Sequence, residues 1–136
     1  MSADLLLANI TRHISLDPEE RTFFISLLNA KSLEPGSFLL REGDICRYES
    51  FITSGCLKSY YSDENGDEHI MDFLVEEWWA NDLYSFFTET ASRSNIKAIE
   101  KTEVLQISKN NLERLYQKIP AFERFFRILF QKAYIA

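Results

Sequence analysis

The spacing of the hydrophobic residues changes twice along the chain, and each change marks a different kind of element. Residues 3–14 repeat apolar side chains at helical intervals, which predicts a helix with one apolar stripe made of Leu6, Leu7, Ile10 and Ile14. A second helix is predicted over residues 18–29. Asp17 can cap it, Pro18 suits its first position, and Glu20 completes a capping box.

From residue 31 the pattern becomes strand-like. Short β-prone runs cover residues 31–33, 38–41, 48–54, 56–62, 67–75 and 103–108, and turn signals such as Pro35-Gly36, Gly43-Asp44 and Gly55 separate them. Because Asn65-Gly66 offers two residues that accept positive φ, the runs 56–62 and 67–75 are predicted to form an antiparallel hairpin. Many short strands joined by tight turns are typical of a sandwich or barrel.

After Ser108 the helical spacing returns. Residues 109–118 predict a short helix, and Pro120 starts a longer one over residues 120–136. Its apolar stripe consists of Phe122, Phe125, Phe126, Leu129, Phe130 and Ala133. Since this helix reaches Ala136 without a capping residue, we expect the chain to continue in a longer protein.

Composition narrows the class of protein. A chain of 136 residues, 46% of them hydrophobic, can form one globular domain. Its net charge of −6 argues against a nucleic-acid-binding surface, since phosphate contacts need a concentrated basic face. Cys46 and Cys56 are too few for a disulfide framework or a four-thiolate iron–sulfur cluster. The N-terminus lacks signal-peptide features and no apolar stretch would span a bilayer, so a cytoplasmic protein without a membrane partner is expected.

The stretch LLREGDICRYESFITSGCLKSYYSDENGDEHIMDFL resembles the front half of the cyclic-nucleotide-binding domain of Crp/Fnr-type transcriptional regulators. Gly43-Asp44 makes one turn, Phe51-Ile52 precede Gly55, and the Asn-Gly hairpin follows. The resemblance extends from about Leu28 to the end of the chain. It implies an α+β fold that is mainly β: a double-stranded β-helix, or jelly-roll barrel, over residues 31–108, flanked by N-terminal helices (1–30) and C-terminal helices (109–136).

The resemblance also implies partners. In the family the long C-terminal helix pairs with its counterpart across a two-fold axis and leads on to a DNA-binding domain. The stripe from Phe122 to Ala133 is therefore expected at the centre of a homodimer, and DNA would be bound only through a domain absent from this chain. Packing of the same stripe against the chain's own barrel is the alternative.

The segment EEWWANDLYSFFTETASRSN, residues 76–95, stands where the family has its phosphate-binding cassette. There a glycine lets backbone N–H groups approach the cyclic phosphate, and a glutamate accepts from the ribose hydroxyl. Asn81, Asp82 and Leu83 occupy these positions here. Asn81 tolerates the positive φ of a glycine, whereas Asp82 is one methylene shorter than glutamate.

The second part of the cassette departs further from the family. An ungapped count places Ser92 on the arginine that pairs with the phosphate, so Arg93 matches only after a one-residue slip, with Ser94 then supplying the hydroxyl. Loss of the arginine and ribose contacts would cost about 3–6 kcal/mol, enough to abolish micromolar binding. We therefore expect a sensor with a degenerate cassette, weak or absent cyclic AMP binding, no cofactor and an unidentified small-molecule effector.

Two other functions compete with a sensor that has a degenerate cassette. A working cyclic-nucleotide sensor would need Arg93 in the pocket. A small cupin-like barrel enzyme would need clustered metal ligands, and with only His13 and His69 we expect neither a metal site nor an enzyme.

Aromatic and basic side chains near these elements also allow more than one interpretation. The aromatic residues of the cassette region would either stack on a purine or pack against the core: Trp78, Trp79, Tyr84, Phe86 and Phe87. Arg41, Arg47 and Lys58 are expected to be surface charges.

Overall fold

The protein is described by a computed structural model that covers residues 2–135. The elements, in chain order, are α1 (Asp4–Thr11), α2 (Pro18–Ser26), β1 (Asn29–Leu33), β2 (Phe38–Leu40), β3 (Tyr48–Ser54), β4 (Cys56–Ser62), β5 (Glu68–Val75), β6 (Trp79–Ala80), α3 (Leu83–Thr88), β7 (Asn95–Ala98), β8 (Thr102–Ser108), α4 (Lys109–Lys118) and α5 (Ala121–Ile135). In this part of the chain no helix is both long and apolar enough to cross a membrane.

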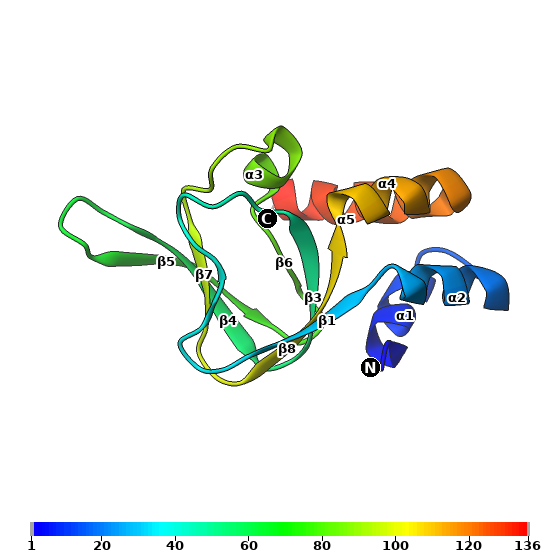
Figure 1. The fold of residues 1–136 in the computed structure, drawn as a ribbon, viewed down its shortest axis with the longest axis horizontal. Helices are drawn as coiled ribbons and strands as arrows, with labels where there is room; N and C mark the ends of the chain where they lie inside the picture. The colour runs from blue at the N-terminus through cyan, green and yellow to red at the C-terminus, as the bar shows by residue number, and fades with distance from the viewer. Residues whose placement is uncertain (1, 136) are drawn as a thin grey trace.

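The strands form two four-stranded antiparallel sheets, ordered β1-β8-β3-β6 and β2-β7-β4-β5. The sheets curl toward each other into a roll, with α4 and α5 along one side, α1 and α2 beside β1, and the β4–β5 hairpin projecting from the opposite side (Figure 1). This arrangement confirms the predicted jelly-roll fold with flanking helices.

The N-terminal capping box is present as the sequence predicts. The Glu20 N–H donates to Asp17 Oδ1 at 2.8 Å, and the Asp17 N–H donates to Glu20 Oε1 at 2.9 Å. This capped helix, α2, ends at Ser26 instead of residue 29, because Asn29 already pairs with Gln106 of β8. Strand pairing therefore ends the helix earlier than helical periodicity suggests.

The predicted hairpin is confirmed, but its turn differs from the expected one. β4 and β5 pair from Cys56↔Val75 to Ser62↔Glu68. Only Gly66, at φ 81°, has a positive φ in the connection, and its N–H donates to the carbonyl oxygen of Asp63 at 3.0 Å. Asp63 Oδ1 also accepts from the N–H groups of Asn65 and Asp67, at 2.8 and 3.0 Å. The Asp63 side chain therefore supports a longer turn than a two-residue Asn-Gly connection.

Two strands have no counterpart in the sequence prediction: β6 and β7. β6 has two residues and β7 has four, so neither is long enough to show a strand period. β7 nevertheless lies inside its sheet, between β2 and β4, and its pairing closes the roll.

The aromatic stripe of α5 packs largely into its own chain. Phe122, Phe125 and Phe126 are buried, with Phe122 stacked on Phe24 at 4.9 Å and Phe126 edge-on to Trp79 at 5.5 Å between ring centroids. These three rings are buried in the chain's own core, as the packing alternative expects. The expectation that they face a partner helix is therefore wrong. Leu129 and Phe130 are half-buried, and Ala133 is exposed.

Gly55 connects the two sheets at a point of close backbone contact. It has φ +103°, and a Cβ there would lie 2.5 Å from the carbonyl oxygen of Lys101 and 2.7 Å from Thr102 Cα. The next residue, Cys56, donates its N–H to Thr102 Oγ1 at 3.2 Å. Gly43 has a similar φ of +94°, but no atom lies within 4 Å of its would-be Cβ.

We predict that Gly55→Ala lowers the free energy of unfolding by about 3 kcal/mol or more, because it adds a backbone clash to the strain of positive φ. The matched variant Gly43→Ala carries only the strain and should lose about 1 kcal/mol. Urea denaturation of both variants measures the difference. Equal losses would contradict the assigned close contact at Gly55.

Candidate functional site

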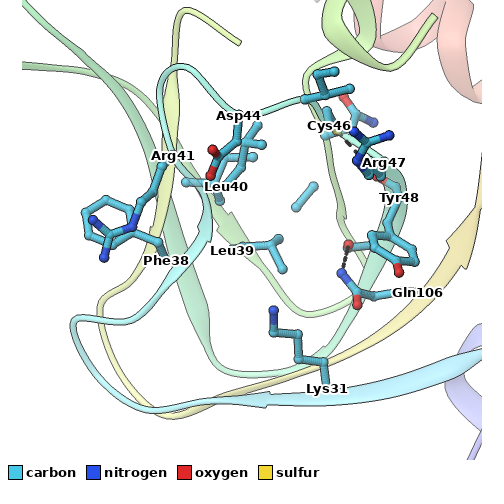
Figure 2. Close-up of a pocket in the computed structure, with 15 residues that line it drawn as sticks. Lys31, Phe38, Leu39, Leu40, Arg41, Asp44, Cys46, Arg47, Tyr48 and Gln106 are labelled. Atoms are coloured by element: carbon cyan, nitrogen blue, oxygen red, sulfur yellow. Dashed lines mark hydrogen bonds between the residues drawn. The ribbon is translucent and has the colours of Figure 1, made fainter. Parts of the chain in front are cut away.

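A cavity of about 290 Å³ lies inside the roll, between the two sheets (Figure 2). This volume is near the lower end of the range for small-molecule sites, roughly 300–1,000 Å³. Part of its lining is apolar and comes mainly from β2 and β7, including Leu39, Leu40 and Ile96. The volume of the cavity therefore fits only a small ligand.

Strand alternation places polar groups on another part of the lining. Ser50 of β3 and Gln106 of β8 are register partners that both point inward, and Gln106 Nε2 donates to Ser50 Oγ at 3.0 Å. Tyr48, two residues before Ser50, lines the same wall. Residues at the intervening positions, Glu49 and Phe51, point out of the roll toward the C-terminal helices.

Three cationic side chains line the cavity and are exposed at the same time. Arg41 and Arg47 are exposed, as expected of surface charges, and they line the cavity together with Lys31 of β1. Arg41 packs its guanidinium over the Phe38 ring, 4.2 Å from the centroid. Lys58, in contrast, is paired on the hairpin surface with Glu68 at 2.7 Å.

The sequence prediction did not place these cations at the cavity, because Arg41 and Arg47 lie in the connection between β2 and β3, whose path depends on how the strands pair. The one signal in the sequence was that basic residues recur in the segments around the first two predicted turns. Without knowledge of strand pairing that signal does not separate lining from solvent-facing positions.

The cassette segment satisfies its own carboxylate. Asp82 caps α3 by accepting from the Ser85 N–H at 3.2 Å through Oδ1. Its other oxygen, Oδ2, accepts from Ser92 Oγ at 2.6 Å and from Ser94 Oγ at 3.5 Å. Ser92 Oγ in turn accepts from the Ser94 N–H at 3.1 Å. Three of the predicted site residues are thus brought together, but they bind one another.

The other three cassette candidates lie apart from this cluster. Asn81 lines the cavity, but it does not have a positive φ, so its expected role as a glycine substitute is wrong. Leu83 is half-buried at the start of α3. Arg93 is exposed on the loop after α3 and does not line the cavity.

The aromatic residues of the cassette region pack or face solvent, and none of them lines the cavity. Trp79 lies edge-on to Phe51 at 5.3 Å and is close to the rings of α5, and Phe86 is buried. Trp78, Tyr84 and Phe87 are exposed. The packing interpretation therefore describes Trp79 and Phe86.

A buried acid connects the cavity to the C-terminal helices. Glu49 is fully buried, and burial raises its pKa to about 8 although a hydrogen bond from Asn81 opposes the rise. That bond, from Asn81 Nδ2 to Glu49 Oε1, is 3.4 Å long. Among the residues whose side chains are described, Glu49 Oε2 and Trp79 Nε1 are buried without a hydrogen-bond partner. The interface between the roll and the helices thus contains two buried polar atoms without a hydrogen-bond partner.

The remaining reactive groups do not assemble into a centre. Burial raises the pKa of the Cys46 thiol to about 11, so the group is a neutral thiol at physiological pH. Within residues 2–135 no three His, Cys, Asp or Glu side chains are grouped so that they would bind a metal ion.

Comparison with known proteins agrees with this geometry. The family model described as the cyclic nucleotide-binding domain matches residues 30–119. The transcriptional activator protein Anr of Pseudomonas aeruginosa is 29% identical over 122 residues, which are 89% of this chain and 49% of Anr. The chain therefore spans about half the length of this relative.

Solved structures show the same fold. The sensor domain of the regulator DNR from Pseudomonas aeruginosa has a TM-score of 0.76 at 18% identity, over 96% of this chain and 87% of that one. The catabolite activator protein of Thermus thermophilus has a TM-score of 0.75 at 19% identity, over 88% of this chain and 55% of that one. With the matched family model, these likenesses show that the chain belongs to the cyclic nucleotide-binding domain family, in the form found in Crp/Fnr-type transcriptional regulators.

Proposed function

We propose that this chain is the effector-sensing part of a transcriptional regulator, that the cavity inside the roll is its effector site, and that its cassette does not bind cyclic AMP in the family's usual way. The observation that carries the proposal is the state of Asp82. Both oxygens of its carboxylate accept hydrogen bonds from Ser85, Ser92 and Ser94. The side chain expected to accept from a ribose hydroxyl is bonded to its own segment and does not line the cavity.

The position of Arg93 supports the same conclusion. Its side chain is exposed and lies outside the cavity lining, while Ser92 on the preceding position is buried and bonded to Asp82. For the Arg93 guanidinium to pair with a cyclic phosphate, the bond between Ser92 and Asp82 would have to break and the loop would have to turn. Losing the two charge-assisted contacts costs about 3–6 kcal/mol of binding free energy, which is two to four powers of ten in affinity.

A route for the signal follows from Asn81 and Glu49. Asn81 lines the cavity and also donates the one hydrogen bond found for the Glu49 carboxyl group. Glu49 points toward α4, where its charge contributes to the raised pKa of Tyr116, and Trp79 packs against Phe126 of α5. An effector that engages the Asn81 amide would change the hydrogen bonding of Glu49 and so the packing of the C-terminal helices.

The outer face of α5 is the proposed dimer surface. Leu129 and Phe130 are half-buried and Ala133 is exposed, so they remain available after Phe122, Phe125 and Phe126 have packed into the core. A parallel pair of such helices would pass a change in tilt to a DNA-binding part of a longer protein.

The first test is a calorimetric titration with cyclic AMP and cyclic GMP. We predict no saturable binding in the micromolar range, because neither the Asp82 carboxylate nor the Arg93 guanidinium lines the cavity. Arg93→Ala should leave the result unchanged. Micromolar affinity that disappears in Arg93→Ala would replace this proposal with a cyclic-nucleotide sensor of the usual kind.

A second test concerns Glu49. Its pKa of about 8 lies above the ordinary value of 4.5, so the stability contributed by its neutral form is complete below pH 4.5 and is lost as pH rises toward 8. Glu49→Gln removes this titration. The free energy of unfolding of the variant relative to the parent should therefore increase between these pH values, by on the order of 3 kcal/mol at pH 7.

Urea denaturation at several pH values measures this difference. Glu64→Gln, a change on the exposed hairpin turn, is the matched control and should follow the parent at every pH. Parallel stability curves for Glu49→Gln and the parent would show that Glu49 is not a buried neutral acid.

A further inference from the structure

Two buried polar side chains lie side by side on one wall of the cavity. Ser50 of β3 is 2% exposed, Gln106 of β8 is 7% exposed, and both line the cavity. They are register partners, and Gln106 Nε2 donates to Ser50 Oγ at 3.0 Å. Burying an amide and a hydroxyl group costs free energy unless their hydrogen bonds are made. The atoms of this pair that remain without a partner therefore indicate what the wall can bind.

The bond to Ser50 uses only part of the Gln106 amide. The amide has two N–H groups and one acceptor oxygen, and Ser50 accepts from one of the N–H groups. Gln106 Oε1 accepts no hydrogen bond from any residue that the structure describes, and it is not closed off from solvent. Figure 2 shows the amide reaching into the cavity from β8, with the bond to Ser50 drawn as a dashed line. The second N–H group and Oε1 thus offer the cavity a donor and an acceptor on one planar group.

Small residues in the same row of the sheet leave space beside this amide. Gln106 pairs with Ser50, and Ser50 pairs in turn with Ala80 of β6. Ala80 is also buried and lines the cavity. Residues paired in one row point to the same face of a sheet. Two short side chains next to a long one therefore leave room for a molecule against the Gln106 amide.

The other sheet supplies an apolar wall. Leu40 of β2 and Ile96 of β7 are register partners in that sheet, both are buried, and both line the cavity. A ligand in contact with them is stabilised by burying apolar surface. The cavity therefore fits a molecule with one apolar side and one hydrogen-bonding edge.

The buried part of the lining carries no charge. All four charged residues that line the cavity are exposed: Lys31, Arg41, Asp44 and Arg47. An ionised group placed against the amide and the hydroxyl group would lose its hydration without gaining an opposite charge. The group that contacts Gln106 is therefore neutral.

We infer that the cavity binds a small neutral primary amide or lactam, whose N–H group donates to Gln106 Oε1 and whose carbonyl oxygen accepts from the free N–H group of Gln106. Such a ligand carries a donor and an acceptor on neighbouring atoms, so it pairs with a second amide through two hydrogen bonds. An ester of the same shape lacks the donor. The inference rests on the proposed function, in which the same cavity is the effector site, and it assigns recognition to β8.

The test is a titration of the ¹⁵N-labelled chain with benzamide, δ-valerolactam, methyl benzoate and benzoate. At least one of the two amides should saturate the chemical shifts of the cavity residues, including the side-chain amide signals of Gln106. Methyl benzoate donates no hydrogen bond and benzoate is charged, so each should bind at least about 10-fold more weakly than that amide. The Gln106 signals report the contact without any substitution.

A substitution at Gln106 tests the same contact. Gln106→Met keeps the length of the side chain and removes its amide. It should weaken the saturating amide by about 10–100-fold, the loss of two hydrogen bonds, and change methyl benzoate by less than about two-fold. Gln117→Met, the same change on the exposed surface of α4, should alter neither affinity. Unchanged thermal unfolding of both variants serves as the folding control.

Three results would overturn the inference. One is that neither amide saturates. Another is that methyl benzoate or benzoate binds as tightly as the amides. The third is that Gln106→Met leaves the affinity for the amides unchanged.

Ala80→Val separates failure of this inference from failure of the proposed function. It narrows the cavity and should weaken every probe that enters. If Ala80→Val weakens binding and Gln106→Met does not, the cavity is an effector site read by other residues, and only the amide inference fails. Failure of the proposed function itself would show differently, as saturation by cyclic AMP through Arg93.

Discussion

The hydrogen bonds of the Asp82 carboxylate determine what the rest of the site can do. One oxygen caps α3 through Ser85, and the other accepts from Ser92 at 2.6 Å, which ties the two ends of the cassette segment together. These bonds lie in a partly buried region, where satisfied polar groups are costly to separate. A cyclic nucleotide would need the same carboxylate and would need Arg93, which the Ser92 bond leaves on the outer surface. The fold of the family is therefore retained, whereas the polar groups of the cassette bond to one another.

In the proposed function, the effector contacts the inner walls of the roll and not the cassette. The sheet register points Ser50 and Gln106 into the cavity, and the same strand points Glu49 at the C-terminal helices. Asn81 touches both sides, since it lines the cavity and donates to Glu49 at 3.4 Å. Because Glu49 Oε2 and Trp79 Nε1 are both unsatisfied, the packing of α4 and α5 on the roll is not fully optimised in this state. A single polar contact can thus link occupancy of the cavity to the helices that lead away from it.

The fold was more accessible to sequence analysis than the site. Capping at Asp17, the turn at Gly66 and the aromatic period of α5 are local, so their elements were predicted correctly. β7 has only four residues, and its place between β2 and β4 comes from long-range pairing. The site depends on that pairing. Lys31 of β1 and Arg47 of the connection before β3 line one cavity, and Ser92 bonds to a carboxylate ten positions away. Neither relation is visible in a linear pattern.

The central claim is that the Asp82 carboxylate is held by its own segment, so that the cassette does not bind a cyclic nucleotide in the family's usual way. The most direct measurement is a crystal structure of the domain grown with an excess of cyclic AMP. No ordered nucleotide should lie against the loop after α3, and the Ser92–Asp82 bond should be intact. A cyclic nucleotide bound against Arg93, with Asp82 released from Ser92, would contradict the claim.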